Sequence, residues 1–317
     1  MKRNRNVWHV VSCAMNRQAW AGYCVARVSA ILCFLAMSSF VVHAQSVTSI
    51  DSLPYQIQAS GNYVLGGDLS LDANAAAISI LAGNVTLDCA GHRITSITQY
   101  PDIVAISAAV DLSDVVIRNC TVVNFDRGIT AGWRAYRTRI LDNQVLDGGA
   151  RGITVLGHDA LVSGNRVIGL RGKPGGTSEG ISVREFDVGI SSTNVKVLDN
   201  VVADIFGDKD AKGIVINQST APEIVGNTIL DVRANPSFYY YSYYIYFTDF
   251  VYAPFVEGVL VRNNVMMSRM LSGAYVVDRA YGGMDNAAAS CTGNVSVGFR
   301  LLNYSPCLLL DRNVDIQ

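Results

Sequence analysis

Charged residues stand at the same place in four similar segments of the sequence. Each directly precedes a Gly-Ile pair: Arg127, Arg151, Glu179 and Lys212. Stacked segments would bring these side chains into one column, with neighbours about 4.8 Å apart. A second group of residues follows the same segments: Trp133, Arg134, His158, Asp159, Arg184, Glu185 and Asp187. Together the two groups could wall a groove of mixed charge.

These residue types favour β-elimination from an acidic sugar. The reaction needs a group that neutralises the uronate carboxylate, a base for the C5 proton and a donor for the leaving oxygen. Arginine, lysine or Ca²⁺ held by carboxylates can do the first, and histidine, lysine, arginine or tyrosine the second. The catalytic candidates are Arg151, Lys212, His158 and Arg184, the candidate Ca²⁺ ligands are Asp159 and Asp187, and the substrate-binding candidates are Glu179, Arg127, Trp133, Tyr244 and Tyr246. The alternative is a ladder of surface ion pairs, each contributing only about 0–1 kcal/mol.

The elements that would position these residues are short β-branched strands, each followed by a corner. The corner residue is Cys twice and then Asn six times: Cys89, Cys120, Asn143, Asn165, Asn200, Asn227, Asn264 and Asn294. The shortest spacing, 22 residues, separates Asn143 from Asn165, and the longest is 37 residues. Self-similarity at such a period is typical of a solenoid, and short β-branched runs favour strands over helices. The sequence therefore predicts an all-β parallel β-helix of about eight to nine coils with an Asn/Cys corner ladder.

Asparagine fits such a corner because it tolerates the left-handed conformation and its amide can bond to the asparagine one coil away. The Gly-Ile segments form a second column. Alternation along each strand predicts inward isoleucines at 129, 153, 181 and 214. The glycine before each strand suits a positive φ or a close backbone approach. Tyr244 takes the place of this glycine in a fifth segment.

The chain resembles the pectate-lyase-like right-handed parallel β-helix superfamily over roughly residues 50 to 310. The resemblance is carried by Leu53-Pro54-Tyr55-Gln56-Ile57 with Gly61–Leu65, NVTLDCAGHRI at 84–94 and IRNCTV at 117–122. It implies a right-handed fold whose site lies along the outer face of the Gly-Ile strands. It leaves the activity open, because this architecture hosts lyases, hydrolases, epimerases, adhesins and inert scaffolds. The polygalacturonase-type Asp pair and Gly-His-Gly are absent, which favours a lyase over a hydrolase, although the Arg-x-Pro-x-x-Arg pattern of pectate lyases is also missing.

Charge and hydropathy define the leader and exclude one class of partner. Five basic and no acidic residues precede residue 45, which leaves 20 basic and 26 acidic residues and no basic stripe for nucleic acid.

Residues 1–44 resemble a signal peptide, with an apolar run at 28–42 and a cleavage signal ending at Ala44. The leader also resembles the extended signal peptide of type V secreted proteins; the alternative is translation from Met15. We expect residues 45–317 to form one periplasmic or secreted domain that is not membrane-integral, with a cap at 45–75 and a last coil at 291–317.

Four cysteines remain after the leader, and an oxidising compartment permits two disulfides. Cys89 and Cys120 occupy the same corner on adjacent coils, within disulfide reach, with stacked buried thiols as the alternative. Cys291 and Cys307 could staple the last coil. Neither pair has the spacing of a zinc site.

The leading prediction is a secreted or periplasmic β-helix that binds an extended acidic polysaccharide or cell-envelope glycan along one face. If it is an enzyme, it would be a polysaccharide lyase. The sequence requires no cofactor for this reaction, although Ca²⁺ could serve as one. The alternative is a non-catalytic cell-surface or adhesive scaffold that binds a partner protein through the tyrosine-rich stretch at 238–255.

Overall fold

The computed structural model describes residues 46–98, 103–184, 192–217, 219–235, 242–248, 259–268, 278–282, 289–297, 307–311 and 314–316. The regular elements in these ranges are all β-strands, and they include no helix long and apolar enough to cross a membrane. Residues 1–44 lie outside the described ranges, so the signal peptide stays a prediction.

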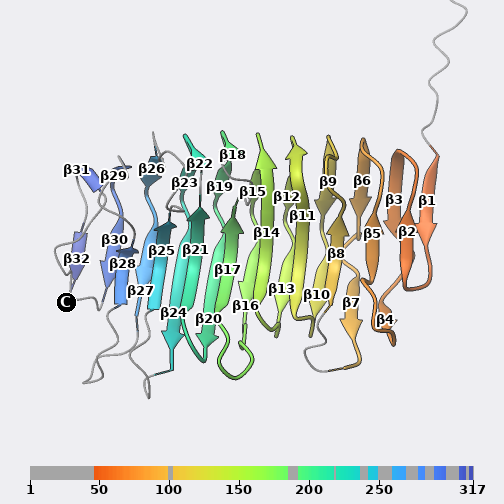
Figure 1. Cartoon of the computed structure of the whole chain (residues 1–317), viewed down its shortest axis with the longest axis horizontal. Coiled ribbons are helices and arrows are strands. Elements are labelled where there is room, and N and C mark those ends of the chain that lie inside the picture. Colours follow the sequence, from red (N-terminus) through yellow and green to blue (C-terminus); the bar gives the residue numbers. More distant parts are fainter. Residues whose placement is uncertain are drawn as a thin grey trace, which may run out of the picture. The chain divides into compact units, whose positions relative to one another are not determined.

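The strands form three parallel sheets that run side by side along the solenoid (Figure 1). Sheet A contains β1 (Val47–Ile50), β3 (Gly61–Leu65), β6 (Val85–Asp88), β9 (Val115–Arg118), β12 (Arg139–Leu141), β15 (Leu161–Ser163), β19 (Lys196–Leu198), β23 (Glu223–Val225), β26 (Val259–Arg262), β29 (Ala289–Thr292) and β31 (Cys307–Asp311). Sheet C contains β4 (Leu69–Leu71), β7 (Arg93–Ser96), β10 (Thr121–Val123), β13 (Gln144–Leu146), β16 (Arg166–Ile168), β20 (Val201–Gly207), β24 (Thr228–Ala234), β27 (Val265–Met267), β30 (Val295–Val297) and β32 (Val314–Ile316). Sheet B contains β2 (Tyr55–Ile57), β5 (Ile78–Ile80), β8 (Val104–Ala108), β11 (Arg127–Tyr136), β14 (Arg151–His158), β17 (Ser178–Val183), β21 (Ala211–Asn217), β25 (Ser242–Thr248) and β28 (Asp278–Gly282).

Each coil passes through sheet A, sheet C and then sheet B. Between β3 and β28 the described strands complete eight such coils. A small fourth sheet, β18 (Ser192–Thr193) with β22 (Ser219–Thr220), lies on the path from sheet B back to sheet A. The predicted parallel β-helix is confirmed.

Aliphatic side chains stacked in columns fill the interior. The predicted inward residues of sheet B pair in register on neighbouring strands and are completely buried: Ile129, Ile153, Ile181 and Ile214. Sheets A and C contribute matching columns, which include Ile117, Ile140, Val162 and Val197 from sheet A and Val122, Val145, Val167 and Val202 from sheet C. Because complete burial of one such side chain contributes about 1.5–3 kcal/mol, these columns hold the three sheets around one core.

Buried asparagines form a continuous hydrogen-bonded ladder at the corner between sheets A and C. The Asn165 amide donates to Asn200 Oδ1 at 3.0 Å and to the main-chain oxygen of Ile140 at 2.8 Å. Asn200 Oδ1 also accepts from the Asn165 backbone N at 2.9 Å. The same pattern joins Asn143, Asn165, Asn200, Asn227, Asn264 and Asn294. The predicted ladder is confirmed.

The left-handed backbone at this corner falls one residue before the ladder asparagine. Asp142, Gly164 and Asp199 have φ of 54°, 69° and 53°, and each precedes a ladder residue. The prediction that the asparagine itself adopts this conformation was wrong for the described corners. The preceding residue makes the turn, and the asparagine is needed for its inward amide.

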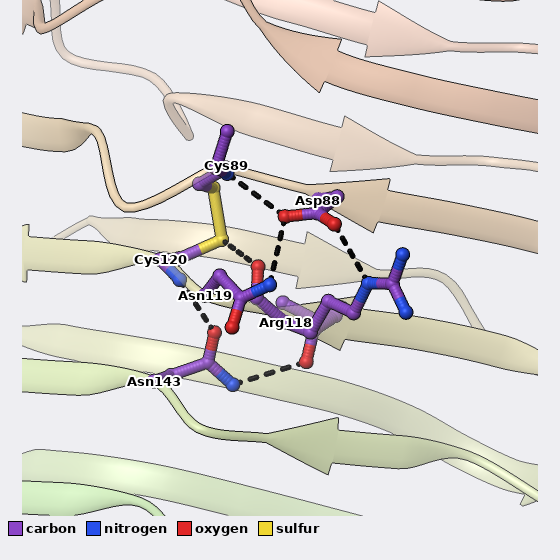
Figure 2. Close-up of polar contacts among 8 residues, drawn as sticks. Asp88, Cys89, Arg118, Asn119, Cys120 and Asn143 are labelled. Carbon is purple, nitrogen blue, oxygen red and sulfur yellow. Dashed lines mark hydrogen bonds and ion pairs between the residues drawn. A yellow bond between two sulfur atoms is a disulfide. The ribbon is translucent and has the colours of Figure 1, made fainter.

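A disulfide replaces the amide ladder at its N-terminal end. Cys89 and Cys120 form a disulfide, with their Cα atoms 4.7 Å apart. Of the two predicted arrangements, a disulfide or stacked thiols, the disulfide is confirmed. Figure 2 shows that the ladder begins directly below, where the Cys120 backbone N donates to Asn143 Oδ1 at 3.0 Å. Cys291 is buried and also disulfide-bonded, whereas the side chain of Cys307 lies outside the described residues, so their predicted pairing stays a prediction.

The glycines before the sheet B isoleucines are required for close packing. A Cβ on Gly152 would lie 2.4 Å from Val167 Cγ1 and 2.5 Å from the main-chain oxygen of Gly180. Of the two reasons that the sequence offered for glycine, close approach is therefore the one that applies here.

Replacing Asn200 with alanine should lower the free energy of unfolding by about 3 kcal/mol. The change removes the Oδ1 acceptor of the Asn165 backbone N–H and the side-chain donor to the Val162 carbonyl, and each buried group left unsatisfied costs about 1–3 kcal/mol. Denaturant unfolding followed by circular dichroism measures the loss. Arg166→Ala, an exposed change on neighbouring β16, is the control and should stay within about 0.5 kcal/mol of the wild type. Equal stability of the two variants would contradict the role given to the ladder.

Candidate functional site

The charged residues before the Gly-Ile pairs form one column across sheet B, as predicted. Arg127 pairs with Arg151, Arg151 with Glu179, and Glu179 with Lys212. The column continues to Tyr243 on β25. Adjacent parallel strands place these residues about 4.8 Å apart.

Glu179 is the centre of a half-buried charge cluster. Only 4% of this residue is exposed. Its Oε1 pairs with Arg184 Nη2 and lies 3.9 Å from Lys212 Nζ, while Arg151 Nε lies 3.5 Å from Oε2. We call Glu179, Arg151, Arg184 and Lys212 the Glu179 cluster. It places three cations around one carboxylate.

Arg184 joins this cluster by folding back along its own strand. Its Nε donates to Ser182 Oγ, and its Nη2 reaches Glu179 at the strand's beginning. The side chain therefore covers Ser182, which points outward but is buried. Burial lowers the pKa of the Arg184 guanidinium, and the Glu179 carboxylate opposes this shift.

Lys212 contacts both the carboxylate and an aromatic pair. Its Nζ lies 4.6 Å from the centroid of the Tyr246 ring, and the Tyr246 and Tyr243 ring centroids are 4.4 Å apart. The Lys212 side chain is only 15% exposed. Burial lowers its pKa below the ordinary 10.5, while Glu179 and Asp210 act in the opposite direction.

A second buried carboxylate lies beside the same column. Asp126 has Arg127 Nε 3.9 Å from Oδ2 and Lys173 Nζ 3.9 Å from Oδ1, and it accepts a hydrogen bond from the Ala150 backbone N. Burial raises the pKa of the Asp126 carboxyl. Arg127, a predicted substrate-binding residue, is exposed. It lies next to Asp126, which the sequence analysis did not identify as a site residue.

His158 lies at the other end of the strand from Arg151. The two residues bound β14, eight residues long, so they are roughly 20 Å apart at about 3.3 Å per residue. His158 Nδ1 lies 3.1 Å from Thr193 Oγ1, and its ring stacks on Tyr136 at a centroid distance of 4.8 Å. The prediction that His158, Arg151 and Lys212 share one catalytic neighbourhood was therefore wrong, because strand length separates them.

Tyr244 does not face the surface. It takes the glycine position of the preceding coils, and its side chain is 0% exposed. Its hydroxyl accepts a hydrogen bond from the Val232 backbone N at 3.2 Å. The prediction that Tyr244 binds substrate was wrong, because the side chain enters the core, and Tyr243 takes the outward position instead.

The predicted calcium ligands are not brought together among the described residues. Asp159 is exposed at a turn and accepts a hydrogen bond from Asn194 Nδ2 at 3.1 Å, and Asp187 lies outside the described ranges. Within those ranges, no three His, Cys, Asp or Glu side chains are grouped so that they could hold a metal ion. The predicted Trp133 is exposed near Tyr136, at the same end of sheet B as His158.

Solved structures with a similar fold are proteins of several kinds, and each is remote in sequence. The catalytic unit of a GH87 α-1,3-glucanase from Streptomyces thermodiastaticus is 12% identical with a TM-score of 0.51, over 84% of this chain and 63% of that one. Tailspike protein 2 of an Escherichia coli O157:H7 bacteriophage is 15% identical with a TM-score of 0.46, over 84% of this chain and 42% of the tailspike. A mannuronan C-5 epimerase A-module from Azotobacter vinelandii is 11% identical with a TM-score of 0.41, over 86% and 87%.

The present chain thus covers less than two thirds of the glucanase unit and of the tailspike. No protein-family model matches the sequence, and a search of curated proteins found no match. At 12% identity, the likeness to the glucanase unit shows a shared fold alone.

The lowered pKa of Lys212 should appear in the pH dependence of stability. Below the folded-state pKa both states hold the proton, and the cost of burying the charge is fully present. Between that pKa and 10.5 the unfolded chain binds more protons, so the free energy of unfolding rises with pH. Relative to Lys212→Met, the wild type should therefore gain stability as the pH rises toward 10.5, measured by urea unfolding.

The variant Glu179→Gln should move this gain to lower pH, because Glu179 raises the pKa of Lys212. Lys209→Met, at an exposed position, corrects for the loss of any lysine. A stability difference between wild type and Lys212→Met that does not change with pH would contradict the assignment.

Proposed function

We propose that the protein binds an extended acidic polysaccharide along the outer face of sheet B, with the Glu179 cluster as the subsite for a uronate carboxylate. The observation that carries the proposal is the convergence of basic side chains at a half-buried position. The side chains of Arg151, Arg184 and Lys212 converge on the carboxylate of Glu179. A ligand carboxylate would approach these side chains from the solvent side, where the Arg151 side chain is 35% exposed.

The cost of burial supports a functional role for this cluster. Burial lowers the pKa of both Lys212 and Arg184, so their charged forms are disfavoured where they lie. Apolar side chains at such positions are often equally or more stabilising than buried ion pairs. Charged groups that are held in spite of desolvation are characteristic of sites that bind or transform a ligand.

The ligand class also agrees with the shape of the face. Strands β11, β14, β17, β21 and β25 lie side by side, so their outward residues form a long surface that an extended chain could follow. The aromatic pair of Tyr243 and Tyr246 extends the Glu179 cluster on the next coil. The glucanase that shares the fold acts, by its name, on a polysaccharide, and we extend that ligand class to this chain.

We further propose β-elimination as the reaction, with Lys212 as the base. A neutral Lys212 amine would take the C5 proton of the uronate; the electrons of that C–H bond would form the C4–C5 double bond as the C4–O bond breaks. The leaving oxygen would take a proton from water. Arg151 and Arg184 would neutralise the carboxylate and so acidify C5, the task that Ca²⁺ performs when carboxylates hold it.

Secretion or a periplasmic location forms part of the proposal. The Cys89–Cys120 bond is typical of an oxidising compartment, and it agrees with the predicted signal peptide. A partner there would be a cell-envelope or extracellular glycan.

Binding is tested by affinity electrophoresis of the full chain in gels that contain polygalacturonate, alginate or hyaluronate. At least one of these polymers should retard the wild type, and Arg151→Gln should lower the affinity by roughly tenfold or more, the effect of about 1.4 kcal/mol. Arg139→Gln, at an exposed position on sheet A, is the matched control and should bind like the wild type. Equal retardation of the Arg151 and Arg139 variants would remove the Glu179 cluster from the site.

Catalysis is tested separately, by ultraviolet absorbance of the double bond that β-elimination creates. The wild type should generate this signal from the polymer that it binds, and Lys212→Met should abolish it while retaining the fold by circular dichroism. Binding without any absorbance change, with or without added Ca²⁺, would leave a glycan-binding protein and reject the lyase. Failure to bind any uronate polymer would favour the adhesive scaffold instead.

A further inference from the structure

Two exposed aromatic residues lie near the C-terminal end of a sheet B strand, whereas the Glu179 cluster lies near the N-terminal ends of the neighbouring strands. Trp133 is 43% exposed and Tyr136 is 42% exposed, both on β11. Large aromatic side chains with half their surface in water are unusual in a strand whose inward neighbours, Ile129 and Ala131, are completely buried. We call Trp133 and Tyr136 the aromatic platform.

An irregularity in the strand displays the platform. β11 pairs regularly with β14 up to Ala131, after which Ala135 is opposite Gly157, so β11 carries two extra residues. Arg134, inside this bulge, has a positive φ of 53°. Bulges of this kind re-aim side chains, and here Trp133 turns toward solvent. Gly132 permits the bend, because a Cβ there would lie 2.3 Å from the main-chain oxygen of Ala109.

The backbone of the platform and the ring of Tyr136 are held in place. The Trp133 carbonyl accepts a hydrogen bond from the Asp111 backbone N at 2.8 Å, and the Tyr136 backbone N donates to the carbonyl of Leu112 at 2.9 Å. The Tyr136 ring stacks on His158 of the next coil, and His158 is in turn within hydrogen-bond distance of Thr193. The Tyr136 side chain therefore loses little conformational freedom when a ligand binds to it.

Two ion pairs flank the platform, and the carboxylate of Asp159 lies close enough to act on Arg137. Arg134 Nε lies 2.8 Å from Asp111 Oδ1, and Arg137 Nη2 lies 2.6 Å from Asp114 Oδ2. Among the described residues, the surface around the two rings therefore shows no excess of cations, unlike the Glu179 cluster, where three basic side chains converge on one carboxylate.

We propose that the aromatic platform is a second subsite, which binds a neutral sugar ring by stacking. The C–H face of a hexopyranose with equatorial hydroxyls is apolar, and its hydroxyl rim is polar. Tyrosine and tryptophan suit such a ligand, because their rings are apolar and their polar edges remain in water. The paired charges nearby give no preference for an anion.

Two unlike subsites on one face define the ligand more closely. The ends of β14, where the Glu179 cluster and the platform lie, are roughly 20 Å apart along the strand. One extended glycan could occupy both if it contained both acidic and neutral sugars. This conclusion, a heteroglycan ligand, rests on the proposed function, whereas the neutral-sugar subsite does not.

Tryptophan fluorescence gives a direct readout, because Trp133 is the only tryptophan besides Trp8 and Trp20. In the full chain with Trp8→Phe and Trp20→Phe, titration with cellohexaose or mannohexaose should change the emission and protect Trp133 from acrylamide quenching. Trigalacturonate should not, since it lacks a neutral ring. If neither neutral hexasaccharide alters the emission or the quenching, the subsite is refuted.

Calorimetric titration of variants tests the assignment to single residues. Tyr136→Ala and Trp133→Ala should each lower the affinity for the neutral hexasaccharide by roughly tenfold, and Trp133→Phe, which keeps a ring, should lose less. Met267→Ala, an equally exposed change on sheet C, is the control and should bind like the wild type. Arg151→Gln should leave neutral-sugar binding unchanged. A wild type that binds the neutral hexasaccharide but no uronate polymer would refute the proposed function and not the platform. Undiminished neutral-sugar affinity in both alanine variants would overturn the platform.

Discussion

The buried amide ladder is the interaction on which the rest of the structure depends. At every corner from Asn143 to Asn294, one side-chain amide must satisfy main-chain groups of its own coil and of its neighbours. Such groups have no water to bond to, so an unmatched rung is costly. The ladder therefore fixes the vertical register of successive coils, and loops of different length can be inserted elsewhere without disturbing it.

Because the register is fixed, equivalent residues of successive coils stack in columns. The isoleucines of sheet B meet in the core because their strands are aligned, and the charged residues outside them meet for the same reason. The ends of the ladder need other solutions, since an end rung lacks one neighbour. At the N-terminal end, the Cys89–Cys120 bond supplies a covalent link where the amide partner is missing.

The outer face of sheet B combines two chemically different regions on one frame. In the Glu179 cluster, long basic side chains converge on a carboxylate and lose hydration. This loss of hydration lowers the pKa of Lys212. At the other end, a bulge exposes rings among charges that are already paired. The outward residues between the two regions are small or aliphatic: Thr130, Thr154, Ser182 and Val215.

The sequence by itself determined the solenoid, the corner ladder, the inward isoleucines and the alignment of Arg127, Arg151, Glu179 and Lys212. These features follow from alternation and corner spacing, which are local and repeat in every coil. Only the tertiary structure decided that Arg184 folds back onto Glu179, that Asp126 lies buried nearby, that Tyr244 fills the core and that His158 stands far from Lys212. Those outcomes depend on strand length, on a bulge and on the rotamers of long side chains. They are set by contacts between coils, and a periodic pattern contains no information about them.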